Sequence, residues 1–272
     1  MAVDASIPQR KRPIAGVGRV IAWPGASLWI GREVGLIDEH AHHAIQVSLA
    51  FREPFRIQAP DWPEWGESRA AVVMPNRAHR LDGCGTAVAN IFVEPNSTQG
   101  AALRKRFAGM DVALLGNAEA EAAVAGVRAQ FLAGAADERL VQYAKGAICR
   151  IAGDPLAAPH SDPRITAALR WMRERLASPL RLQDVAAAVH LSPGRFRHLF
   201  VAQTGTSFRA WLLWARAEAA IAVGTRGGSW TEAAQGAGFA DAAHFTRTCR
   251  RVFGIAPTML VFEQVPDRDT HG

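Results

Sequence analysis

A short helical pattern occurs twice within residues 182–257, and it constrains the fold more than any other feature of the chain. Each copy has a short amphipathic segment containing Ala-Ala, a tight turn, and a second segment that carries Arg and His. Ser192 is a suitable N-cap for the second segment of the first copy, with Pro193 at the first helical position, and Asp241 takes the cap in the second copy. The pattern predicts two helix-turn-helix units.

The segment between the two units is predicted to be a rigid spacer. The two caps, Ser192 and Asp241, are 49 residues apart, and one long apolar helix is predicted over 207–223. Two protruding helices at a fixed separation suit successive major-groove segments on one face of DNA, about 34 Å apart. We therefore expect this part of the chain to bind DNA.

The positive charge of the chain lies over the same region. Residues 160–265 hold 13 Arg and no Lys against seven acidic residues, whereas residues 1–159 hold 17 basic and 16 acidic residues. A basic surface is what contacts with phosphate require. The chain prefers Arg to Lys throughout, but that preference does not explain why the excess gathers in one half.

Composition excludes several other classes of protein. With 272 residues, 49% of them hydrophobic and 21% charged, the chain is expected to fold into one or two domains rather than stay disordered. Its three cysteines are widely spaced, which indicates neither a disulfide framework nor a zinc finger. Without a signal peptide or membrane span in the sequence, we expect a cytoplasmic protein that does not contact a membrane.

The N-terminal half is predicted to be an antiparallel β-barrel or sandwich. Residues 1–16 read as a mobile basic tail, and the β-rich domain is expected to occupy about 17–96. Short runs of β-forming residues alternate there with Gly, Pro, Asp and Asn, which is typical of such folds. The runs are 19–23, 27–30, 44–51, 70–74 and 87–93.

One stretch of this region carries residues suited to binding a ligand. It reads Glu39-His40-Ala-His42-His43-Ala-Ile-Gln46, and a later turn, Pro75-Asn-Arg-Ala-His79, supplies another histidine. The arrangement resembles the two motifs of a cupin barrel. The resemblance places His40, His42 and His79 at histidine positions, and Gln46 where a carboxylate ligand is expected.

Two interpretations of these residues stay open. Imidazoles on adjacent strands could converge on a divalent metal, although an amide in place of a carboxylate removes an anionic ligand. Alternatively, the histidines line a barrel mouth that binds a small organic effector, or face solvent. We expect no cofactor, with the metal as the alternative. His43 breaks the alternation of His40 and His42, so it is expected to be structural or exposed.

Three helices are predicted between the barrel and a linker. Apolar residues recur at helical spacing over 99–107, 118–132 and 138–151, so the N-terminal domain is expected to end at about 152. These helices could form a homodimer surface or cover their own barrel, and the sequence favours neither. Residues 153–163 contain three prolines and are interpreted as the linker.

The region after the linker is predicted to be entirely helical. Residues 164–262 are expected to fold into about seven helices, followed by a tail over 263–272. The whole chain is therefore expected to be α+β, with an N-terminal antiparallel barrel followed by helices and a C-terminal all-α domain.

Individual residues of the C-terminal region occur in a familiar order. This order is similar to that of the DNA-binding domain of the AraC/XylS family of bacterial transcription regulators, in which a cupin-like sensor domain commonly comes first. The resemblance rests on Leu191, Ser192, Phe196, Leu199, Phe200, Gly205, Phe208, Arg216, Ala220, Ala234, Gly238, Phe239, Asp241, His244, Phe245, Arg247, Phe253, Gly254 and Pro257.

The resemblance also implies which residues meet DNA. In the first unit, Gly194, Arg195, Arg197 and His198 are expected to face outward, and family members contact bases from the positions of Gly194, Arg197 and His198. Because Gly194 has no side chain, Arg197 and His198 are expected to read the bases. In the second unit, the polar readers are expected to be Arg247 and His244. The other expected contacts there are Ala242, Ala243 and Thr246, with Arg250 and Arg251 on phosphates.

These features favour a one-component transcription regulator in which an unidentified small-molecule effector, or a metal, acts on the barrel. Its expected partner is a double-stranded DNA operator, with RNA polymerase and a second copy of the chain as further candidates. One alternative is a metal-dependent cupin enzyme fused to a DNA-binding domain. Another is a DNA-binding protein without any ligand, whose barrel serves only as a contact module.

Overall fold

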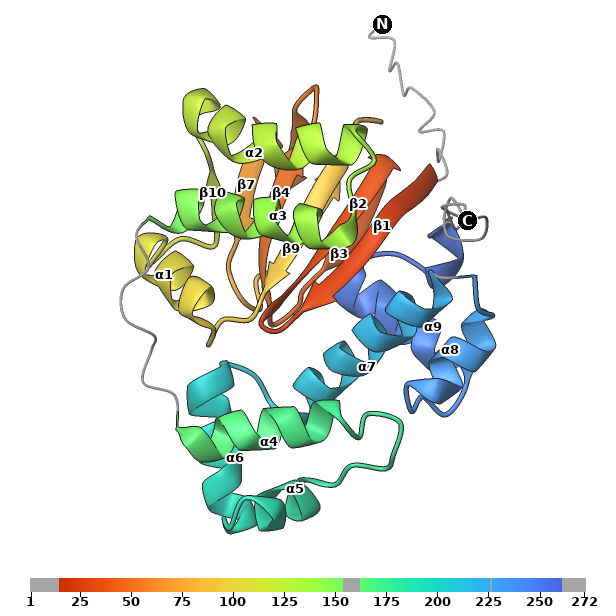
Figure 1. Ribbon diagram of the computed structural model, residues 1–272. Helices are drawn as coiled ribbons and strands as arrows, with labels where there is room; N and C mark the ends of the chain where they lie inside the picture. Colours follow the sequence, from red (N-terminus) through yellow and green to blue (C-terminus); the bar gives the residue numbers. More distant parts are fainter. Residues whose placement is uncertain (1–14, 154–161, 226, 261–272) are drawn as a thin grey trace, which may run out of the picture.

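The computed structural model describes residues 15–153, 162–225 and 227–260. The expected basic tail, linker and C-terminal tail lie largely outside these ranges. The described residues form an N-terminal pair of antiparallel sheets with three helices, followed by an all-helical region (Figure 1). The α+β fold class predicted from the sequence is confirmed.

The larger sheet has six strands, all paired antiparallel, in the order β1-β2-β9-β4-β7-β10. Its side chains alternate between two apolar cores because successive residues of a strand point to opposite faces. Val47 and Ile91, for example, enter one core, while Val73 and Phe92 enter the other. The strands are β1 (Ala15–Trp23), β2 (Ala26–Glu33), β9 (Val88–Val93), β4 (Ile45–Ala50), β7 (Ala70–Val73) and β10 (Val112–Leu114).

The smaller sheet faces the larger one across the second of these cores. It contributes the buried side chains Phe55, Ile57 and Leu81 to that core. None of its strands was among the β-rich runs predicted from the sequence. In spatial order they are β3 (Leu36–His40), β8 (His79–Asp82), β5 (Phe55–Gln58) and β6 (Gly66–Ser68).

Three helices follow β9, with β10 between the first and the second: α1 (Thr98–Arg106), α2 (Asn117–Leu132) and α3 (Asp137–Ala152). Helices α2 and α3 lie over the outer face of the six-stranded sheet, where their buried side chains complete the first core (Figure 1). Of the two roles predicted for these helices, covering their own sheet is the one the structure shows. A homodimer surface stays a prediction.

The C-terminal region contains, within the described residues, six α-helices and a short 3₁₀ turn at Pro257–Met259. The predicted N-caps form, since the side chains of Ser192 and Asp241 accept hydrogen bonds from the backbone of α6 and α9. The α-helices are α4 (Pro163–Arg173), α5 (Leu182–Ala188), α6 (Pro193–Thr204), α7 (Phe208–Gly224), α8 (Trp230–Gly236) and α9 (Ala242–Phe253).

The two helix-turn-helix units pack in different surroundings. The first unit, α5 and α6, shares its own core with α4 and the start of α7. The second unit, α8 and α9, joins the core of the two sheets. Trp214 of α7 lies at this junction, with its ring 5.3 Å from that of Phe92 on β9 and 4.8 Å from that of Phe253 on α9. Helix α9 is therefore held against the N-terminal half.

Candidate DNA interface and ligand site

Helix α6 presents the residues predicted to read DNA to solvent. Its N-terminus is fixed by Ser192, whose hydroxyl accepts a hydrogen bond from the backbone N–H of Arg195 at 3.3 Å. Phe196 and Phe200 point into the core, so Arg197 and His198 between them face outward. The predicted residues Gly194, Arg195, Arg197 and His198 are all exposed.

The residues of α9 that were predicted to contact DNA differ in their exposure. Arg247 and Arg250 are exposed, whereas His244 is half-buried with its ring edge-on to Phe239 at 5.2 Å. The hydroxyl of Thr246 donates to the carbonyl of Ala242 at 2.8 Å, so it is already used within the helix. Of the remaining predicted residues, Ala243 is exposed, Ala242 is half-buried, and Arg251 is exposed and lines a cavity described below.

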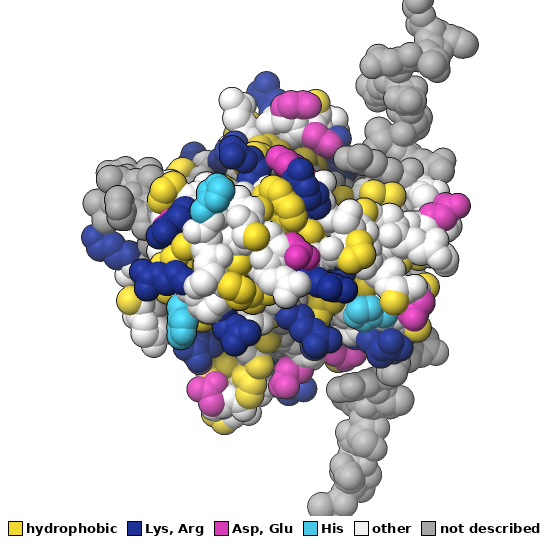
Figure 2. Space-filling view, turned by 90° about the horizontal axis from the view of Figure 1, so that it is seen from below, with side chains coloured by type: hydrophobic (Ala, Val, Ile, Leu, Met, Phe, Trp, Pro, Cys, Tyr) yellow, Lys and Arg dark blue, Asp and Glu magenta, His cyan; other side chains and the backbone are white. Residues whose placement is uncertain are grey.

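Basic side chains extend across the face of the molecule that lies at the bottom of Figure 1, where α4, α5 and α6 are. Figure 2 shows many Lys and Arg side chains there, interspersed with fewer Asp and Glu side chains. This distribution agrees with the excess of Arg over acidic residues in 160–265. A face of this kind attracts the phosphate backbone of a nucleic acid.

A cavity of about 520 Å³ lies between the N-terminal half and helices α7 and α9. Its volume is in the range of small-molecule sites. Leu213 and Trp214 supply apolar wall, and two arginines, Arg209 of α7 and Arg251 of α9, supply positive charge. Two of the predicted histidines, His40 and His42, also line it.

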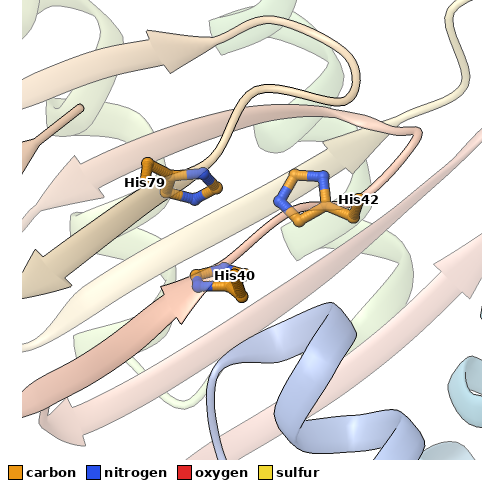
Figure 3. A group of neighbouring side chains, drawn as sticks. All are labelled: His40, His42 and His79. Carbon is orange, nitrogen blue, oxygen red and sulfur yellow. The ribbon is translucent and has the colours of Figure 1, made fainter. Parts of the chain in front are cut away.

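The three histidines singled out by the sequence converge. His40 ends β3, His42 follows in the next loop and His79 begins β8, and Figure 3 shows their rings grouped together. One ligand atom from each lies within 4.8 Å of those of the other two. Gln46 of β4 joins them, because its Oε1 lies 2.9 Å from His42 Nε2 and 3.3 Å from His79 Nε2. All four side chains are buried.

Each of the three rings is oriented through its Nδ1 atom. That atom lies 2.9 Å from a backbone carbonyl oxygen in every case: Asp38 for His40, Ala44 for His42 and Arg77 for His79. Because a carbonyl can only accept, Nδ1 carries the proton and donates, and Nε2 keeps its lone pair. The lone pairs of His42 and His79 are therefore directed at Gln46.

Burial keeps these histidines neutral. It lowers the pKa of His40 to about 4 and that of His42 to about 3, in the second case together with the charge of His40. Burial also lowers the pKa of His79 well below its ordinary value, with further effects from His40 and His42. At neutral pH all three imidazoles keep the lone pair that a ligand atom needs.

Hydrogen bonds around Gln46 set the direction of its amide. Ser48 Oγ donates to Asn90 Oδ1 at 2.7 Å, so the hydroxyl accepts from Gln46 Nε2 at 2.9 Å. The amide nitrogen of Gln46 thus donates to Ser48 on the side away from the histidines, and Oε1 points toward them. The site collects three electron-pair donors within a short distance: two imidazole nitrogens and one amide oxygen, with His40 beside them.

His43, the histidine expected to be structural or exposed, is buried and structural. Its ring meets Trp214 edge-on at 5.1 Å, and its Nε2 lies 3.7 Å from Glu94 Oε2. Glu94 also pairs with Arg173 of α4, which in turn lies 3.9 Å from Glu218 of α7. This ion-pair group links the residue that follows β9 to both helices, and sequence reasoning missed it because its members are far apart in the chain.

Strand β3 and the last turn of α9 are joined through their backbones. The N–H of Asp38 donates to the carbonyl of Gly254 at 3.3 Å, and the N–H of Ala41 donates to that of Arg251 at 3.4 Å. Gly254 has a positive φ of 70° and fits closely, since a Cβ there would lie 2.4 Å from Asp38 O. Carbonyls at a helix C-terminus need partners from outside the helix, and β3 and the residue that follows it supply two of them. This contact was also missed from the sequence.

Comparison with known proteins assigns the C-terminal region. A family model described as a helix-turn-helix domain matches residues 185–261. The matching curated relatives include proteins named as regulators. Residues 185–261 form an AraC-type helix-turn-helix domain. The AraC-type domain thus includes both of the repeated units found in the sequence.

Two curated relatives resemble this part of the chain. The regulatory protein PocR of Salmonella typhimurium is 34% identical over 101 residues, which cover 36% of this chain and 33% of PocR. The transcriptional activator NphR of a Rhodococcus species is 33% identical over 134 residues, covering 48% of this chain and 38% of NphR. The matched segment therefore spans little more than a third of either relative.

The fold of both halves together resembles a solved structure. ToxT of Vibrio cholerae superposes with a TM-score of 0.52 at 11% identity, over 87% of this chain and 97% of ToxT. A second ToxT structure, bound to an unsaturated fatty acid, gives the same TM-score over 88% of this chain and 96% of ToxT. At such identities the likeness concerns the fold alone. Among the described helices, we find none of the length and apolarity needed to cross a membrane.

Proposed function

We propose that this protein is a sequence-specific DNA-binding transcription regulator of the one-component type. The observation that carries the proposal is the presence, in an AraC-type domain, of two capped helices with exposed arginines at their outward faces, Arg197 on α6 and Arg247 on α9. Arginine can pair bidentately with guanine O6 and N7, which contributes about 1–3 kcal/mol of discrimination between bases. The names of PocR and NphR as regulators support the same function.

The residues of the two helices divide into readers and positioning contacts. Arg197 and His198 read bases from α6, and Arg247 with His244 does so from α9. Arg250 contacts phosphate, which fixes register without specifying sequence. The remaining predicted residues contribute backbone, methyl or phosphate contacts: Gly194, Arg195, Ala242, Ala243, Thr246 and Arg251.

The N-terminal half senses a small molecule in the cavity between the halves. Its size, its apolar wall at Leu213 and Trp214, and the cations Arg209 and Arg251 suit a ligand with an apolar body and an acidic group. The fatty-acid-bound ToxT structure is a precedent for ligand binding by this fold. Such a ligand would act by binding one arrangement of the halves better than another.

Three finer statements belong to the same proposal. The regulator acts in the cytoplasm, contacts RNA polymerase at its operator, and binds DNA as a homodimer. We also propose that it has no catalytic activity, since the relatives that match it are named as regulators. Turnover of any substrate by the purified protein would contradict this last statement.

Selection of bound sequences from genomic DNA tests the proposal. The full chain should enrich a defined motif, and Arg197→Ala and Arg247→Ala should each weaken binding to it by roughly 1–3 kcal/mol and relax base preference. Arg104→Ala, on the exposed face of α1, is a matched control that should leave the motif and affinity unchanged. Failure to enrich any motif would refute the proposed function, and unchanged footprints in both reader variants would refute the assignment of those residues.

A further inference from the structure

We propose that His40, His42, His79 and Gln46 bind a divalent first-row transition-metal ion, and that this ion fixes the contact between β3 and the reading helix α9. The part concerning DNA rests on the function proposed above; the metal site itself does not.

The donors are arranged as a metal site requires. Each imidazole donates its Nδ1 proton to a backbone carbonyl at 2.9 Å, an orientation that directs Nε2 inward and is typical of histidines that ligate metals. His42 Nε2 and Gln46 Oε1 lie 2.9 Å apart, and Gln46 Oε1 lies 3.3 Å from His79 Nε2. These separations suit atoms that bind one cation together.

The donor set selects the class of ion. Three imidazoles and one amide oxygen form a mainly nitrogen set, whereas Mg²⁺ and Ca²⁺ prefer oxygen ligands throughout. Imidazole ligands suit Zn²⁺, Fe²⁺, Ni²⁺ and Cu²⁺. The set is neutral, so the bound ion keeps its full positive charge and can accept a further, anionic ligand from the cavity that His40 and His42 line.

A short chain of contacts leads from the ion to α9. The ring of His40 donates to Asp38 O, and the N–H of the same residue, Asp38, donates to Gly254 O at the end of α9. A Cβ at Gly254 would lie 2.8 Å from His40 Nδ1, so ring and helix end are in direct contact. Figure 3 shows a helix end running beside His40. Holding His40 on an ion therefore holds the strand that supplies hydrogen bonds to the last turn of α9.

Metal binding by the full-length protein is tested without DNA. After treatment with a chelator, the protein should bind one Zn²⁺ per chain in calorimetry, and one Co²⁺ with the visible absorption bands of a low-coordinate nitrogen site. His79→Gln should weaken binding at least about tenfold. Gln46→Glu, which supplies an anionic ligand, should bind Zn²⁺ more tightly than the wild type, and this gain cannot arise from misfolding.

His190→Asn is the matched control, because His190 is an exposed histidine with a positive φ of 56° that Asn also adopts readily. It should bind Zn²⁺ like the wild type. The site is refuted if the wild-type protein binds no ion, or if His79→Gln, folded by circular dichroism, binds Zn²⁺ with unchanged affinity and cobalt spectrum.

The link to α9 is tested by amide hydrogen exchange and then by DNA binding. Zn²⁺ should slow exchange at the N–H groups of Asp38 and Ala41 in the wild type and have no effect in His79→Gln. Zn²⁺ should also tighten wild-type binding to the selected operator severalfold. Stoichiometric metal with unchanged exchange and unchanged operator affinity would refute the link. Binding of Zn²⁺ by a protein that recognises no DNA at all would instead refute the proposed function and leave the metal site intact.

Discussion

Gly254 and His40 touch across the boundary between the two halves of the protein: a Cβ added at Gly254 would lie 2.8 Å from His40 Nδ1. Gly254 ends α9, and His40 ends β3. The end of a helix in the AraC-type domain is thus in contact with a member of the histidine cluster.

Gly254→Ala should destabilise the protein more than the same change at Gly205. Both glycines end a helix in the left-handed conformation, with φ of 70° and 72°. Alanine in that conformation costs roughly 1–2 kcal/mol at either position. At Gly254 the methyl group would also overlap Asp38 O and His40, whereas nothing lies within 4 Å at Gly205.

Overpacking adds about 1–3 kcal/mol, so the two variants should differ by that amount in the free energy of unfolding measured with urea. Equal losses of unfolding free energy in the two variants would show that the contact between β3 and α9 adjusts to the added methyl group without an energetic cost.

Trp214→Ala should be among the most damaging single changes in the helical region. The indole is buried among the rings of His42, His43, Phe92 and Phe253, at centroid distances of 4.8–5.3 Å. Removing a buried indole costs about 3–5 kcal/mol. Half-buried Trp171 on α4, which stacks with Arg175, is the control and should cost much less. Chemical denaturation compares the two, and a larger loss for Trp171→Ala would contradict the placement of Trp214 at the junction.

Stability should fall in acid because of Glu94. Burial alone would raise the pKa of this carboxyl, but His43 and Arg173 outweigh burial and lower it from 4.5 to about 2. Since the pKa in the folded protein is below the unfolded value, the ionised group stabilises the fold above about pH 5, and this contribution is lost as the pH falls toward 2. Glu94→Gln should therefore cost on the order of 1–3 kcal/mol at pH 7.

The difference between Glu94→Gln and the wild type should shrink as the pH falls, which unfolding curves at several pH values would record. Glu121→Gln is the control: Glu121 also pairs with arginines, Arg69 and Arg128, but its side chain is far more exposed, so solvent screens the pairs. A pH-independent difference for Glu94→Gln would contradict this assignment.

Replacing Arg250 and Arg197 by Ala should affect DNA binding in different ways. Arg250→Ala should weaken binding to all DNA sequences about equally and reduce the slope of log affinity against log salt by about 1, because a phosphate contact is lost. Arg197→Ala should instead lower the preference for the selected motif over its single-base variants. Competition titrations at several salt concentrations separate the two effects. A salt slope that changes only in Arg197→Ala would reverse the assigned roles.

Much of the larger sheet could be predicted from the sequence, and the smaller sheet could not. The five predicted runs fall in β1, β2, β4, β7 and β9, all strands of the six-stranded sheet. These strands are rich in apolar and β-branched residues because both faces of the sheet are covered. The strands of the smaller sheet are three to five residues long and contain charged or polar residues, so neither length nor hydrophobicity sets them apart from loops.

The histidine cluster could be predicted because its residues match the two motifs of a cupin barrel. His40 and His42 are two residues apart, and the turn before His79 marks the start of a strand that pairs with β3. The amide direction of Gln46, in contrast, depends on Ser48 and on Asn90, a residue 44 positions away. The ion pairs of Glu94 and the β3–α9 contact depend on how the halves pack, which no local pattern encodes. The roles of the DNA-facing residues remain predictions.

The hydrogen bonds from Asp38 and Ala41 to the end of α9 imply that the C-terminal helical region would not keep its structure unchanged when separated from the sheets. A fragment starting at Asp162 would leave the carbonyls of Arg251 and Gly254 without these donors and would expose Trp214 to water. Joining that region to a different sensor would require a replacement segment with two N–H groups at the same spacing as those of Asp38 and Ala41.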